Sequence, residues 1–170
     1  MKFSKEEKKF WQTHYHFDKP SQLYENWQQI WSVCDDTDDD FFYFFTLRVT
    51  SITNIYLKET LVSDVAVRYM TKFKELESLV LRRHENITKD SIPFFNQMEK
   101  LKSLNITKTN ITLTDLYDLL NNQSLKEVFL DSEGEENNLL EIAFVLKERM
   151  PNCDIYLNTS DSSGERSIFY

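Results

Sequence analysis

The chain has 170 residues, of which 41% are hydrophobic and 14% aromatic, and its formal net charge is −8 at pH 7. These values predict one globular domain with a continuous core, and they exclude a disordered or low-complexity chain. The acidic balance argues against nucleic acid as a ligand, because phosphate binding needs a dominant basic surface. A basic protein is the partner that this charge favours.

The first residues predict a helical segment that covers one end of the fold. Ser4 and Glu7 have the spacing of a capping box, and the apolar residues Phe10 and Trp11 follow it. We assign residues 1–27 to this N-terminal helical cap. The start of the chain is charged, and the sequence has no apolar run of about 18 residues. We therefore expect a cytoplasmic protein without a membrane span.

Residues 28–51 form a candidate degenerate repeat with two competing interpretations. The triplet 31–33 (Trp-Ser-Val) lies 24 residues before the triplet 55–57 (Ile-Tyr-Leu), which favours a strand followed by a helix. Alternatively, the first part is helical and the run 41–45 (Phe-Phe-Tyr-Phe-Phe) is the strand. The helical interpretation is supported by four apolar residues on one face, namely Leu23, Trp27, Ile30 and Trp31.

From residue 52 onward, an aliphatic phrase with the spacing Leu-x-x-Leu-x-Leu recurs every 24 to 27 residues. Copies begin at residues 52, 76, 101 and 125, and a shortened copy occupies 155–157. In a strand, residues two apart point the same way, so the last two aliphatic positions of each phrase should be buried and the residue between them should point out. We expect one continuous buried ladder that includes Leu79, Leu81, Leu104, Ile106, Val128 and Leu130.

Helix signals follow the strand phrases. Ser63 and Ser91 are candidate N-caps, and Thr114 with Asp115 is predicted to begin a third helix. A last helix over 139–146 is expected to end before Pro151. Strand and helix therefore alternate, which predicts an α/β fold with a parallel sheet covered by helices.

The recurring phrase resembles the leucine-rich repeat, in the longer strand-helix form of the ribonuclease-inhibitor-like superfamily. The resemblance covers residues 52–160 and leaves 161–170 as a C-terminal tail within a single domain, 1–170. It implies a solenoid with a parallel concave sheet and outer helices. The chain departs from the family at the position usually held by Asn or Cys, which here is Thr60, His84, Thr109 and Glu133.

The side chains that point out from the concave sheet are the candidate binding residues. If Ile55 and Leu57 point into the core, Tyr56 points out, and the same register applies to the later strands. Exposed aromatics would supply affinity, and flanking charges would orient the partner. The predicted partner-binding residues are Tyr56, Lys58, Arg82, Arg83, Asn105, Lys108, Glu127, Phe129, Asp131, Asp154 and Tyr156. Alternatively, the C-terminal tail or the loop 132–136 covers an outward aromatic.

No residue pattern predicts catalysis, a metal or a cofactor. His14 and His16 lack further ligands at a suitable spacing, and the acidic run 35–40 lacks the glycine and the closing glutamate of a calcium loop. Glycine-rich phosphate loops are also missing from the sequence. Cys34 and Cys153 are expected to be free thiols, because they fall near opposite ends of the proposed stack.

The resemblance implies a binding function. Ribonuclease-inhibitor-like repeats include stoichiometric inhibitors, and small acidic members resemble bacterial immunity proteins that block a basic toxin. Our hypothesis is a non-catalytic protein–protein interaction module of this kind. The alternatives are an adaptor or scaffold subunit of a larger complex and, less favoured, an RNA-binding module that uses Tyr56 and Arg82. The sequence leaves homo-oligomerisation open.

Overall fold

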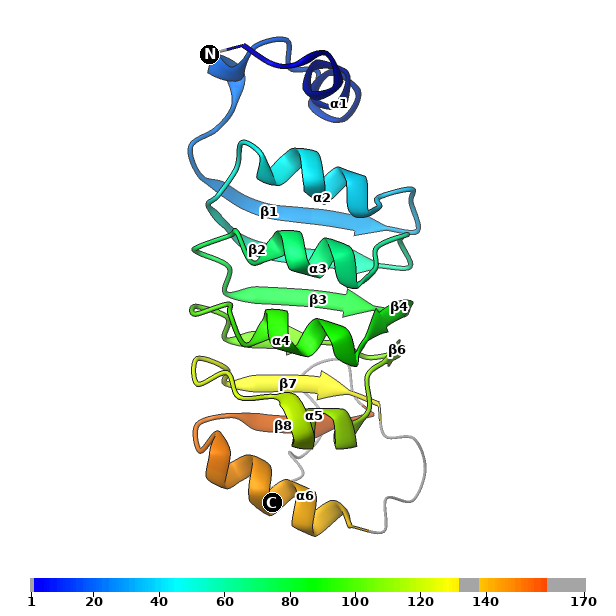
Figure 1. The fold of residues 1–170 in the computed structure, drawn as a ribbon, viewed down its shortest axis with the longest axis vertical. Helices are drawn as coiled ribbons and strands as arrows, with labels where there is room; N and C mark the ends of the chain where they lie inside the picture. Colours follow the sequence, from blue (N-terminus) through cyan, green and yellow to red (C-terminus); the bar gives the residue numbers. More distant parts are fainter. Residues whose placement is uncertain (1, 132–137, 159–170) are drawn as a thin grey trace.

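A computed structural model of the chain describes residues 2–131 and 138–158 (Figure 1). Its main feature is a six-stranded sheet in which every neighbouring pair of strands is parallel. The predicted α/β class with a parallel sheet is therefore confirmed. In spatial order the strands are β1 (Trp27–Val33), β2 (Ile52–Lys58), β3 (Ser78–Arg82), β5 (Ser103–Asn105), β7 (Glu127–Leu130) and β8 (Asp154–Leu157).

The helices that connect successive strands lie on one side of the sheet, and the first helix of the chain lies at the β1 end (Figure 1). A second, two-stranded parallel sheet extends the turns after β3 and β5. Among the described residues, no helix is long and apolar enough to cross a membrane. The helices are α1 (Lys5–Tyr15), α2 (Asp39–Thr46), α3 (Asp64–Met70), α4 (Ile92–Phe95), α5 (Leu113–Leu119) and α6 (Leu139–Arg149), with 3₁₀ turns η1 (Pro20–Gln22) and η2 (Lys89–Ser91) and the short strands β4 (His84–Thr88) and β6 (Thr109–Asn110).

The core is a ladder of aliphatic side chains between the sheet and the helices. Leu79, Leu104, Val128 and Ile155 lie in register on four neighbouring strands, and each is at most 1% exposed. Every member of the predicted ladder is buried, so that prediction is confirmed. Strand alternation sends these side chains to the helical side, and the residues between them to the opposite side.

Capping side chains set the starts of the helices. Ser4 Oγ accepts a hydrogen bond from Glu7 N at 3.1 Å, and Ser4 N donates to Glu7 Oε2 at 2.8 Å, so the predicted capping box is confirmed. Helix α5 begins earlier than predicted. Its N-cap is Thr112, which forms a capping box with Asp115 and displaces Thr114 from that role.

Residues 27–51 form a strand followed by a helix, which makes the helical interpretation of the first part wrong. Strand β1 pairs with β2 so that Ile30 lies beside Ile55 and Trp31 beside Tyr56. The offset is therefore one residue longer than the sequence suggested. A one-residue shift exchanges the two faces of a strand, so Trp31 points away from the core and is 64% exposed.

The apolar run 41–45 is helical because Asp38 caps it and only some of its rings face the core. The Asp38 carboxylate accepts a hydrogen bond from Phe41 N at 2.9 Å. Phe41 and Phe42 lie one helical turn before Phe45 and all three are buried, whereas Tyr43 is exposed. Helical periodicity therefore explains the burial of this run better than the alternation of a strand.

One turn holds a buried histidine where the resemblance led us to expect Asn or Cys. His84 is buried, and its Nε2 lies 3.1 Å from Thr60 N and 2.9 Å from Thr60 Oγ1. Burial lowers the pKa of His84 from its ordinary value, which favours the neutral ring that accepts these bonds. Thr109 Oγ1 instead donates to Ile106 O at 2.8 Å. Glu133, at the corresponding position further on, lies outside the described residues.

Candidate functional site

The side of the six-stranded sheet that faces away from the helices is named the open face here. One residue from each strand points out on this face in a single in-register row, because parallel pairing keeps equivalent positions side by side. Four of its six members are among the predicted binding residues. The row consists of Trp31, Tyr56, Val80, Asn105, Phe129 and Tyr156.

Aromatic rings stack at both ends of this row. The rings of Trp31 and Tyr56 lie 4.1 Å apart between centroids with planes 7° apart, and those of Phe129 and Tyr156 lie 4.9 Å apart at 14°. Each pair spans two neighbouring strands, so strand register fixes its geometry. Trp31 was not among the predicted site residues. The signal that identifies it is the 25-residue offset between β1 and β2, which the sequence interpretation placed at 24.

Two predicted binding residues are buried, which corrects their assignment as exposed contacts. Phe129 and Asn105 are each 4% exposed, whereas Tyr56, Val80 and Tyr156 are half-buried. Asn105 Oδ1 accepts hydrogen bonds from Thr107 N at 3.1 Å and Thr107 Oγ1 at 2.8 Å, which ties the side chain to the turn after its own strand. Phe129 supports the ring of Tyr156 and offers little surface of its own. The predicted covering segments, residues 132–136 and 161–170, lie outside the described residues.

Basic side chains gather at the carboxyl ends of β2 and β3. Lys58 and Arg82 lie side by side in register, two residues beyond the outward row and so on the same face. Arg82 Nε donates to Thr107 Oγ1 at 3.2 Å. Arg83 and Lys108 lie in the turns that follow the strands, with left-handed φ values of 59° and 57°. These two residues therefore lie beyond the strands that form the open face.

Acidic side chains gather at the amino ends of the last strands. Glu127 and Asp154 lie side by side, two residues before the outward row. Glu127 Oε1 accepts from Ser103 Oγ at 2.7 Å, and Asp154 forms an ion pair of 3.1 Å with Lys147. Basic and acidic groups thus occupy diagonally opposite corners of the face. Asp131 has a different role, since its carboxylate accepts the backbone N–H of Lys108 at 2.6 Å.

The turns at the carboxyl ends of the strands carry a second row of interacting side chains. Cys34, Glu59 and Arg83 each have a left-handed φ. Cys34 Sγ donates to Glu59 Oε2 at 2.8 Å, and Arg83 forms an ion pair with Glu59. These contacts lower the pKa of Glu59 to about 2, with the thiol hydrogen bond the larger cause. The same hydrogen bond to Glu59 raises the pKa of Cys34. Both cysteines are free thiols, as predicted.

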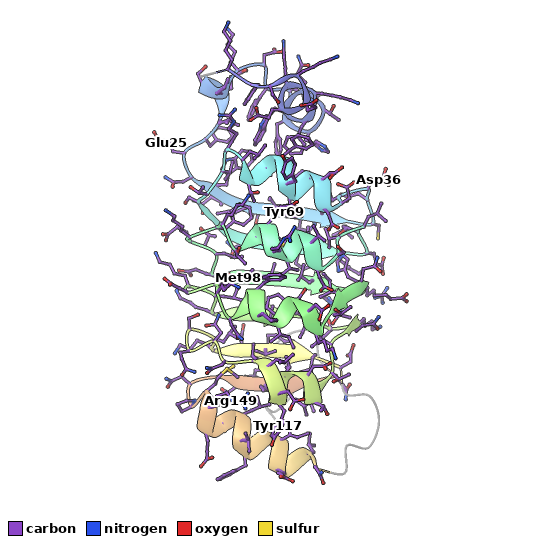
Figure 2. The ribbon with its side chains drawn as sticks, viewed as in Figure 1. Glu25, Asp36, Tyr69, Met98, Tyr117 and Arg149 are labelled. Carbon is purple, nitrogen blue, oxygen red and sulfur yellow. The ribbon has the colours of Figure 1, made fainter. Side chains whose placement is uncertain are left out.

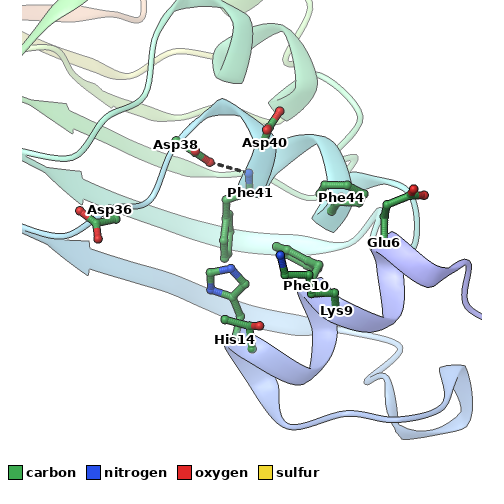
Figure 3. A pocket seen from close by; sticks show the side chains of 10 residues that line it. Glu6, Lys9, Phe10, His14, Asp36, Asp38, Asp40, Phe41 and Phe44 are labelled. Carbon is green, nitrogen blue, oxygen red and sulfur yellow. Dashed lines mark hydrogen bonds between the residues drawn. The ribbon is translucent and has the colours of Figure 1, made fainter.

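A hollow of about 370 Å³ lies between α1 and the start of α2 (Figure 3). Phe10, Phe41 and Phe44 form its apolar lining, and the His14 ring packs edge-on against Phe41 at 5.2 Å. Partial desolvation of the ring lowers the pKa of His14, against the opposing effect of the Asp38 and Asp35 carboxylates. Among residues 2–131 and 138–158, no three His, Cys, Asp or Glu side chains are grouped so that they could hold a metal ion. Acidic groups rim the hollow, namely Glu6, Asp36, Asp38 and Asp40.

A scan against protein-family models finds no match for this chain, and a search of the curated proteins finds no similar sequence. Function must therefore be inferred from the geometry and charge of the open face.

Proposed function

We propose that the chain is a leucine-rich-repeat protein whose open face binds another protein without catalysis. A curved solenoid with this sheet on its concave side is part of the proposal. Its support is the regular alternation of strand and helix, with neighbouring strands offset by 24 to 27 residues. The observation that carries the binding proposal is the outward row, and above all the stacked pair Trp31 and Tyr56 at its exposed end.

An exposed stacked pair is suited to anchoring a partner. The two rings already hold each other nearly parallel, so little side-chain entropy remains to be lost when a partner covers them. Trp and Tyr are also the residues that most often dominate binding energy at protein interfaces. Trp31 is 64% exposed, so a partner could bury much of its surface, whereas Phe129 is already buried. We therefore place the main anchor at the β1–β2 end of the row.

The charge of the chain favours a basic partner. A net charge of −8 attracts a positively charged protein at long range, and the acidic corner at Glu127 and Asp154 can orient it. Lys58 and Arg82 would meet an acidic patch on the same partner. The narrower proposal is a stoichiometric inhibitor, such as an immunity protein against a basic toxin. Free thiols fit a reducing compartment such as the cytoplasm.

The experiment is affinity capture from cells of the source organism with three versions of the tagged chain. They are the wild type, the double variant Trp31→Ala and Tyr56→Ala, and the control Lys72→Ala, which alters an exposed residue just after α3 on the helical side. A basic protein captured by the wild type and the control, but lost with the double variant, supports the proposal. Equal capture by all three versions would overturn it.

A further inference from the structure

Strand β1 is an edge strand whose sequence does not discourage a further strand from pairing with it. It has a neighbour on one side only, β2, so half of its backbone N–H and C=O groups face the other side. Native edge strands are commonly protected by charges, prolines or bulges. The seven residues of β1, Trp-Gln-Gln-Ile-Trp-Ser-Val, include no charge and no proline. Among the described residues, the preceding segment 2–24 packs rings against Trp27 but forms no backbone–backbone hydrogen bond with β1.

A groove of about 330 Å³ runs along this edge. One wall is β1 itself, from Trp27 to Ser32, and the other includes His14 and Tyr15 at the end of α1. Tyr15 packs edge-on against Trp27 at 5.0 Å and closes one part of the groove. An exposed strand edge beside a helix is the arrangement in which an extended peptide adds as a further strand.

Acidic residues flank both ends of the edge. Their charge disfavours a second copy of the chain as the occupant and favours an extended basic segment. Figure 2 shows Glu25 at the amino end of β1 and Asp36 at its carboxyl end, and both are exposed. A second copy pairing antiparallel would bring Glu25 of each copy close to Asp36 of the other, and like charges in such positions repel. An extended segment with a basic residue near each end would instead meet an opposite charge at both ends.

We propose that the β1 edge binds an extended basic segment of a protein partner by adding it as a seventh strand. The inference rests on the proposed function, because it specifies how one part of the same partner docks. Backbone hydrogen bonds to β1 would supply sequence-independent affinity, and the flanking carboxylates would select positive charge. The segment would also cover the outer side of Trp31, which lies at the corner between the edge and the open face.

The test uses a synthetic probe, acetyl-Lys-Thr-Val-Thr-Val-Arg-amide, and the full chain. Hydrogen–deuterium exchange should show added protection within 27–33, and a labelled peptide should give the affinity. The control peptide has the same sequence with its four central amides methylated, so that it keeps the charge but cannot donate to β1. The double variant Glu25→Lys and Asp36→Lys should bind the probe about tenfold more weakly at low salt. The matched variant Glu99→Lys and Asp118→Lys, with the same net charge change at other exposed positions, should bind as the wild type does.

Three results would overturn the inference. They are equal binding of the methylated peptide, protection confined to residues outside 27–33, and a stable dimer of the chain that the Trp31→Ala variant dissolves. The probe assay does not use the natural partner, so it is independent of the proposed function. Loss of partner binding in the Tyr56→Ala variant without protection of β1 by the probe would defeat this inference alone.

Discussion

The carboxylate of Asp39 accepts hydrogen bonds from Ser63, which lies 24 residues further along the chain, at 2.8 Å from the backbone nitrogen and 2.6 Å from the hydroxyl oxygen. It also accepts the backbone N–H of Ala66 at 3.1 Å. Asp64 repeats the arrangement with Thr88 N at 2.9 Å and Thr88 Oγ1 at 2.7 Å. The first residue of one helix thus satisfies the exposed donors at the start of the next helix or 3₁₀ turn. These bonds hold neighbouring strand-helix units in register on the helical side.

Replacement of Asp39 by alanine is expected to lower the free energy of unfolding by about 1–3 kcal/mol, because three donors lose their acceptor. Asp40→Ala is the matched control. Asp40 lies in the same first helical turn but is exposed, so its change should stay within about 1 kcal/mol. Urea unfolding of both variants measures the difference. Equal effects would show that the Asp39 bonds contribute nothing specific.

Leu104→Ala should cost about 2–5 kcal/mol, because the fully buried side chain leaves a cavity in the middle of the ladder. Leu61→Ala removes the same atoms from a residue that is 61% exposed, and should cost less than about 1 kcal/mol. Chemical denaturation with two-state analysis gives both values. A near-neutral Leu104→Ala would contradict the packing of the ladder.

Stability should fall in acid partly through Glu7, which is buried and forms an ion pair with Arg48. The Arg48 hydrogen bond holds the pKa of Glu7 below its ordinary value of 4.5. A lowered folded-state pKa contributes stability that is present above pH 4.5 and is lost as the pH falls through the folded value. Glu7→Gln should therefore be less stable than the wild type at neutral pH and show a smaller loss in acid. Parallel slopes of unfolding free energy against pH for the two proteins would refute this.

Cys34 should react slowly with iodoacetamide although it is exposed, since its hydrogen bond to Glu59 raises the pKa of the thiol. Glu59→Gln removes the negative charge and should speed alkylation several-fold at mildly alkaline pH. Cys153 is an internal control in the same sample, because burial raises its pKa to about 12 and should keep it unreactive while the chain is folded. Mass spectrometry of the modified peptides measures both rates, and an unchanged Cys34 rate in the variant would contradict the assigned contact.

The buried ladder could be predicted from sequence because aliphatic residues recur at every core position of the later strands. The register of strand β1 could not be predicted in the same way. Its core position opposite Leu57 holds Ser32, whose hydroxyl is buried and hydrogen-bonded to Asp35 and Thr37. A serine at that position breaks the aliphatic pattern that marks the other strands. The sequence interpretation therefore placed β1 24 residues before β2 instead of 25, which assigned Trp31 to the wrong face.

Exposure on the open face could be predicted only in part. Strand alternation correctly sends Tyr56 and Phe129 outward, but it cannot say how much of a side chain its neighbours cover. Phe129 lies between Asn105 and Tyr156 on its two neighbouring strands and is buried, whereas Trp31 on the edge strand has a neighbour, Tyr56, on one side only and remains exposed. Strand alternation cannot place Arg83 and Lys108, because both lie in turns beyond the ends of β3 and β5 and have a left-handed φ.

The most direct test of the proposed binding face is calorimetric titration of the captured partner, once purified, against the Tyr56→Ala, Trp31→Ala and Lys72→Ala variants. Loss of either ring of the stacked pair should weaken binding by about 2 kcal/mol or more, which is roughly a thirtyfold increase in Kd. Lys72→Ala should leave Kd unchanged. Unchanged Kd for both aromatic variants, together with weakened binding by Lys72→Ala, would show that the partner docks on the helical side and that the open face is not the site.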